Sequence, residues 1–142
     1  QWAGVPGTTS TGQVMRLPES FHKLIAYQWL WRTLFCISIA AITWLGFTSE
    51  PYPIPSAASD KVNHLLAFME LTILTRLGWP RLGLLPPLLI LTGFGLALEL
   101  GQSITPWRDF AVSDLLADMI GIVLGYGLMS LFFRLTGFRS ND

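Results

Sequence analysis

The sequence has little charge and almost no cysteine. Charged residues make up 13% of its 142 residues and hydrophobic residues 51%, whereas about a quarter of a soluble domain is usually charged. Such a chain has too little charge to cover a surface that faces water. The single cysteine, Cys36, excludes an intrachain disulfide and a metal site built from cysteines. The nine lysines and arginines balance nine acidic residues and are scattered singly, so no nucleic-acid partner is expected.

Two further absences limit the function. The chain has only two histidines, and one histidine without a second nearby makes a poor metal site by ligand count. We therefore expect neither a metal nor another cofactor. The sequence also lacks a serine-nucleophile motif, a phosphate-binding loop and a histidine-rich metal helix. An enzymatic role is for this reason the least favoured one.

The first part of the chain differs from the rest. Residues 1–20 are rich in glycine, serine, threonine and proline and show no hydrophobic periodicity, which predicts a tail. Met15 opens a stretch typical of a native start, so we expect residues 1–14 to be foreign to the functional protein. Residues 21–139 would form one domain.

Long apolar runs predict the fold. Residues 33–49 contain no charge, and with their flanks they give a helical span of about 20 residues, enough to cross a hydrocarbon core of about 30 Å. Residues 21–31 predict an amphipathic lead-in at the membrane interface. Three prolines between residues 51 and 55 then end the helix. We predict an all-α membrane protein, a bundle of four transmembrane helices with spans at residues 30–47, 61–77, 86–103 and 113–133.

Polar residues next to these spans suggest how the helices begin. Ser59 or Asp60 would cap the second span and Ser113 the fourth, because short polar side chains accept hydrogen bonds from the free N–H groups of a first turn.

The distribution of basic residues predicts the orientation, because lysine and arginine are retained on the cytoplasmic side. With both termini cytoplasmic, that side would hold seven of them: Arg16, Lys23, Arg32, Arg76, Arg81, Arg134 and Arg139. The outer side would hold only Lys61 and Arg108.

This threading brings ionisable residues from three spans to one face of the membrane. Charged groups at the inner edge of apolar segments are costly and usually mark function. We name the set the polar cluster: Asp60, Lys61, His64, Glu99, Gln102, Arg108, Asp114 and Asp118. Gly121 and Gly125 continue the face of the fourth span that carries Asp114 and Asp118, at a spacing that lets membrane helices pack closely.

Each group in the cluster has a chemical and a structural interpretation. Asp114 and Asp118 could form an acid–base pair. A structural role is favoured, in which Asp114 caps or neutralises the start of the fourth span while Asp118 pairs with Lys61 or Arg108. For His64, a hydrogen bond to Glu99 or Asp114 is favoured over a role as general base.

Arg108 also has two interpretations, which the sequence supports about equally. It could bind a phosphate or carboxylate of a ligand, or it could form an ion pair with Asp114.

The spacing of these residues resembles that of the VanZ-like family of small bacterial membrane proteins. The pattern covers about residues 30–134 and consists of Asp60-Lys61-x-x-His64-x-x-x-Phe68, Glu99-x-x-Gln102, Arg108 six residues before Asp114, and Gly121. The resemblance implies a multi-pass protein of the bacterial cytoplasmic (inner) membrane, with relatives that give low-level teicoplanin resistance. Asp118 departs from the pattern, because the family usually has asparagine there.

Three functions follow as hypotheses. The protein could bind or handle an anionic lipid or a lipid-linked cell-wall precursor at the outer face, with Arg108 and Lys61 holding the anion. Alternatively, it could be an accessory or scaffolding subunit among other membrane subunits, with a purely structural polar cluster. A hydrolase or transferase acting on lipid-linked precursors is the third.

Overall fold

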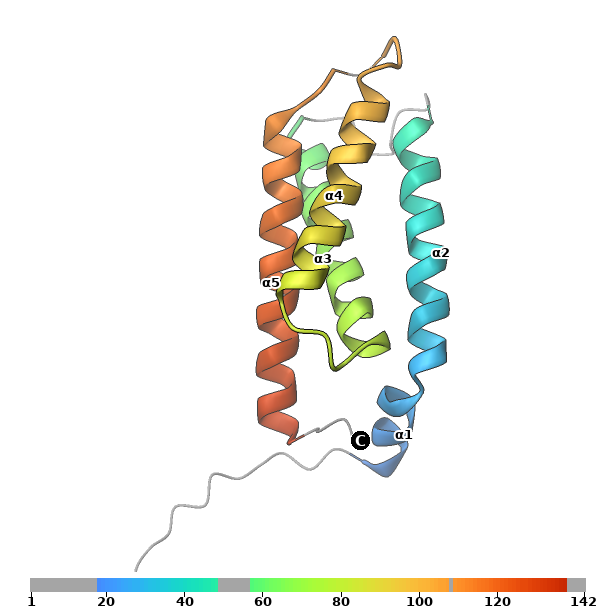
Figure 1. Cartoon of the computed structure of the whole chain (residues 1–142), viewed down its shortest axis with the longest axis vertical. Coiled ribbons are helices and arrows are strands. Elements are labelled where there is room, and N and C mark those ends of the chain that lie inside the picture. The colour runs from blue at the N-terminus through green and yellow to red at the C-terminus, as the bar shows by residue number, and fades with distance from the viewer. Residues whose placement is uncertain (1–17, 49–56, 108, 138–142) are drawn as a thin grey trace, which may run out of the picture.

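The computed structural model describes residues 18–48, 57–107 and 109–137, which contain helices and no strand. The helices are α1 (Glu19–Ala26), α2 (Gln28–Phe47), α3 (Ala57–Gly78), α4 (Leu85–Gln102) and α5 (Val112–Thr136). Figure 1 shows α2 to α5 side by side and alternating in direction, so that α1 and the last turn of α5 lie at the same end. The all-helical prediction is confirmed for the described residues.

Two helix starts differ from the prediction. α3 begins at Ala57, so Ser59 and Asp60 lie inside its first turn and neither is its cap. α5 follows Ala111, whose side chain makes no capping hydrogen bond, so the predicted cap at Ser113 is wrong. Both helices start earlier than expected. For α5 the reason is a contact from another helix, described below, that holds Ala111.

The amphipathic lead-in is a separate helix. α1 ends at Ala26, and Tyr27 has a non-helical backbone before α2 begins at Gln28. Trp31 of α2 donates its indole N–H to the carbonyl of Leu24 in α1, over 3.1 Å. This contact stabilises the bend between the two helices.

Three of the described helices are long and apolar enough to cross a membrane: α2, α4 and α5. α3 does not meet that criterion, although it has 22 residues. The reason is chemical, because α3 carries five ionisable side chains along its length: Asp60, Lys61, His64, Glu70 and Arg76.

α3 lies at the centre of the bundle and packs most extensively against α5. Its Phe68 and Leu71 belong to a buried core with Leu91 and Leu98 of α4 and Ile122 of α5. Glycines set the distance between α3 and α5. A Cβ on Gly121 would collide with the carbonyl oxygen of Leu65, and one on Gly125 would lie 2.7 Å from that of Met69.

At the end of the bundle near α1, Arg76 is held by structural contacts. Its guanidinium donates to the carbonyl of Leu82 over 2.6 Å and lies 4.7 Å from the ring centre of Tyr126. These contacts connect α3, the loop that follows it and α5, about three helical turns along α3 from His64.

Candidate functional site

His64 is the central residue of the polar cluster. It lies on α3, and its Nδ1 is 2.9 Å from Oδ1 of Asp118 on α5. A carboxylate only accepts hydrogen bonds, so the imidazole donates its Nδ1–H. We predicted a hydrogen bond from His64 to Glu99 or Asp114. That prediction is wrong, because the partner is Asp118.

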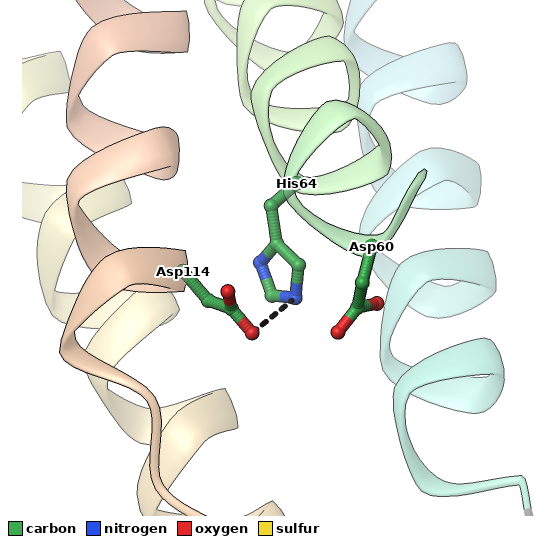
Figure 2. Close-up of side chains that lie close together, drawn as sticks. All are labelled: Asp60, His64 and Asp114. Atoms are coloured by element: carbon green, nitrogen blue, oxygen red, sulfur yellow. Dashed lines mark ion pairs between the residues drawn. The ribbon is translucent and has the colours of Figure 1, made fainter. Parts of the chain in front are cut away.

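The second ring nitrogen of His64 faces two other carboxylates. Nε2 lies 3.8 Å from Oε1 of Glu99 and 3.8 Å from Oδ2 of Asp114. Both distances exceed a hydrogen bond, which ends near 3.2 Å for these atoms. Figure 2 shows the imidazole between Asp114 on one side and Asp60 on the other.

Asp114 is the partner of the one described cation at this end. The ammonium of Lys61 lies 3.7 Å from Oδ1 of Asp114, and the lysine side chain is 48% exposed. The expected pairing of Asp118 with Lys61 is thus wrong. Arg108 lies outside the described residues, so its expected pairing and its role stay predictions.

Glu99 connects the cluster to the start of α5. The residue is 1% exposed, and its Oε2 accepts the backbone N–H of Ala111 at 3.1 Å. This bond holds the residue from which α5 starts, which explains why the helix needs no cap from Ser113. The other oxygen, Oε1, is buried and has no hydrogen-bond partner among the described residues.

Asp118 is fully buried and is accommodated by a glycine of α4. Its Oδ2, which has no hydrogen-bond partner in the described part of the chain, would lie 2.5 Å from a Cβ added to Gly95. Any larger residue at this position would displace the carboxylate, and with it the hydrogen bond to His64. Gly95 is therefore a supporting residue of the site.

Gln102 belongs to the same end of the bundle but contacts a different element. Its side-chain nitrogen donates to the carbonyl of Gly46 in α2 over 2.8 Å. This is a fixed connection between α4 and α2. Gly46 could not have been singled out from the sequence, because its contribution is a backbone carbonyl.

A cavity of about 510 Å³ opens beside the cluster, between α2, α3 and α4. One end is lined by Asp60, Asn63, His64 and Gln102, and the walls are apolar, with Ile42, Leu45, Leu66, Ala67, Phe68 and Leu98 among them. At its other end Ser38 donates to Glu70 over 3.0 Å. The sequence predicted the polar residues at the same level but not this cavity.

Three of the cluster's side chains could also hold an ion. One ligand atom from each of Asp60, His64 and Asp114 lies within 4.8 Å of the other two. The prediction of no metal was based on the numbers of histidines and cysteines, and it did not include carboxylates from another helix. It stays a prediction.

The geometry agrees with the family pattern, since Asp60, Lys61, His64, Glu99 and Asp114 all meet at one end of the bundle. No curated protein and no solved structure matches the chain. The family model described as VanZ/LLP1 matches residues 5–133. Because this match covers most of its length, the chain belongs to the VanZ/LLP1 family, a membrane-associated family connected with teicoplanin resistance.

Proposed function

We propose that this protein binds an anionic amphiphile, a lipid or a lipid-linked cell-wall precursor, at the outer face of the bacterial inner membrane. The observation that carries the proposal is the cavity between α2, α3 and α4, which is polar beside the cluster, apolar along its walls, and bounded at the far end by the hydrogen-bonded pair of Ser38 and Glu70. An amphiphile has the same division, with a charged headgroup and an apolar chain.

The proposal includes a multi-pass bundle in which α3 crosses the membrane together with the three apolar helices. Large apolar side chains are exposed along the three apolar helices, among them Trp44, Leu89, Ile90, Val123, Leu128 and Leu131. Such surfaces suit contact with lipid chains. The 22 residues of α3 would extend about 33 Å. Its ionisable groups lie in the polar cluster, beside the cavity or, for Arg76, against Leu82 and Tyr126.

Both termini would be cytoplasmic. Their positions in the helices place four basic residues at or near the end of the bundle that contains α1: Lys23, Arg32, Arg76 and Arg134. Lys61 lies in the first turns of α3, at the other end. This asymmetry supports an outer location for the polar cluster, because basic residues are retained on the cytoplasmic side.

The headgroup must supply the binding free energy. A lipid chain that moves from the bilayer into an apolar cavity exchanges one hydrocarbon environment for another, so it gains little from the hydrophobic effect. The apolar walls select for a chain of suitable shape, whereas an anionic headgroup gains charge-assisted hydrogen bonds.

Lys61 does not line the cavity, but it follows Asp60, which does, and it would make such a bond to a headgroup at the mouth. Its ammonium is half-exposed, and at 3.7 Å its pairing with Asp114 is loose, so it can also contact a ligand. Arg108, in the connection between α4 and α5, would add a bidentate contact to a phosphate or carboxylate.

A matched pair of tryptophan variants tests the cavity. Ala41 lines it, whereas Ala40 is an exposed neighbour on α2 that does not. Native mass spectrometry of the purified protein with phosphatidylglycerol and phosphatidylcholine should show preferential retention of the anionic lipid. Ala41→Trp should abolish that preference and Ala40→Trp should preserve it. Equal retention by both variants would contradict the proposal.

The charges are tested separately. Arg108→Ala should remove the preference for the anionic lipid while the protein inserts normally, whereas Arg134→Ala, at the other end of the bundle, should leave it intact. Unchanged lipid preference in a well-inserted Arg108→Ala protein would rule out the anion-binding role.

A second function is supported by the internal pairing of the cluster. His64 is bonded to Asp118, Lys61 lies beside Asp114, and Glu99 holds the start of α5. Such pairing suits an accessory subunit in which the cluster only locks the helices together. Co-purification of a membrane partner at fixed stoichiometry would support this function, and a partner-free, monodisperse protein would count against it.

A further inference from the structure

We propose that Asp60, His64, Glu99 and Asp114 form a binding site for a divalent transition-metal ion. Ligand atoms of Asp60, His64 and Asp114 lie within 4.8 Å of one another, and they come from α3 and α5 (Figure 2). Asp60 and His64 are four residues apart, which places them on one face of α3. Glu99, on α4, lies next to this group, with its Oε1 3.8 Å from Nε2 of His64.

The orientation of the imidazole is that of a metal ligand. Its Nδ1–H is donated to Asp118, so the lone pair of a neutral ring lies on Nε2. A carboxylate that accepts the second N–H is the usual partner of a metal-binding histidine, because it fixes the tautomer and the direction of the ring. Asp118 would be a positioning residue in this site.

The spacing of the ligand atoms suits a shared ion better than direct contact. Nε2 lies 3.8 Å from oxygens of both Glu99 and Asp114, too far for hydrogen bonds. Two ligands at about 2.1 Å from a tetrahedral ion are about 3.4 Å apart. A small inward movement of each side chain would therefore complete the coordination.

Glu99 provides independent evidence for a ligand. The residue is 1% exposed, and its Oε1 is buried without a hydrogen-bond partner among the described residues. Buried polar atoms are normally satisfied, and this one points toward Nε2 of His64. An ion between them would satisfy the oxygen.

The local charge also calls for a cation. Four carboxylates, those of Asp60, Glu99, Asp114 and Asp118, surround His64, and Lys61 is the cation that the structure describes beside them. Mutual repulsion between carboxylates is strong away from water. A doubly charged ion would offset much of it.

The donor set indicates the class of ion. Imidazole nitrogen with carboxylate oxygens suits zinc or manganese, whereas calcium and magnesium prefer oxygen ligands alone. Asp60 and His64 also line the polar end of the cavity. If the proposed function holds, the ion would meet the anionic headgroup there; metal binding itself does not depend on that function.

Zinc titration of the purified, chelator-stripped protein tests the site without any lipid. Isothermal titration calorimetry should show saturable binding of one Zn²⁺ per chain. His64→Ala and Asp60→Asn should each weaken it at least about tenfold, since even outer-sphere partners of a metal contribute that much. Asp60 is half-exposed in the first turns of α3, so its substitution leaves the core intact if His64→Ala fails to fold.

Matched controls come from the same chain. His22→Ala, in α1, and Asp109→Asn, exposed in the connection before α5, should bind Zn²⁺ like the unmodified protein. Absence of saturable binding would overturn the site, and so would unchanged affinity in Asp60→Asn. Neither result would bear on lipid retention, which is measured separately.

Discussion

The contact between α3 and α5 determines the geometry of the site, and Gly121→Ala tests it. A Cβ on Gly121 would collide with the carbonyl oxygen of Leu65 and would lie 3.1 Å from the backbone nitrogen of Met69. Both are backbone atoms within α3, so no side-chain rotation can relieve the collision. The two helices would have to separate.

The expected magnitude follows from two opposing effects. Overpacking of this kind costs about 1–3 kcal/mol, and replacing glycine by alanine within a helix regains about 0.5–1 kcal/mol. The difference is a net loss of up to about 2.5 kcal/mol in the free energy of unfolding. Because the collision is with backbone atoms, we expect the upper part of that range, about 1–2 kcal/mol, or a decrease of roughly 3–8 °C in Tm for a chain of this size.

Gly127→Ala is the matched control, because a Cβ there would meet nothing within 4 Å. It lies on the same helix, so it retains the helix-forming gain without the collision, and it should stabilise the protein by about 0.5–1 kcal/mol. Thermal unfolding in detergent, followed by circular dichroism, measures both variants. If Gly121→Ala unfolds at or above the temperature of Gly127→Ala, close α3–α5 packing is not what holds the site.

Three other predictions concern individual contacts. Gln102→Leu should reduce the unfolding free energy by about 1–3 kcal/mol, because the buried carbonyl of Gly46 loses its donor; a change below half a kcal/mol in thermal unfolding would contradict that. A double-mutant cycle of His64→Ala and Asp118→Ala should give a coupling of about 0.5–3 kcal/mol, whereas additive effects would show that the bond contributes nothing. Arg108→Ala, expressed to the normal membrane level, should abolish any teicoplanin resistance that the protein confers; full resistance would exclude anion binding by Arg108.

The three apolar spans were predictable because each is a long apolar run, and prolines mark an end of two of them. Three prolines follow the first span and Pro86-Pro87 open the third. The helix starts were less predictable, since Ala111 at the start of α5 is held by Glu99 of another helix. No local pattern encodes such a contact.

The site could be predicted at the level of which residues meet, but not how they pair. Alternating helix directions place Asp60, His64, Glu99 and Asp114 at one end. The rotation and axial offset of α3 against α5 decide that His64 contacts Asp118, and the small residue at Gly121 allows that offset. The cavity depends in addition on how far α2 stands from α3, which spacing within one helix cannot specify.

The central claim is that the cavity between α2, α3 and α4 holds the chain of an anionic amphiphile. Photo-crosslinking with a phosphatidylglycerol that carries a diazirine in its acyl chain tests it most directly. At a low ratio of lipid to protein in detergent, mass spectrometry should locate the crosslinks at cavity-lining residues such as Ala41, Leu45 and Leu66, and an excess of unlabelled phosphatidylglycerol should suppress them. Crosslinks spread evenly over the exposed face of α5, at residues such as Leu128 and Leu131, would contradict the claim.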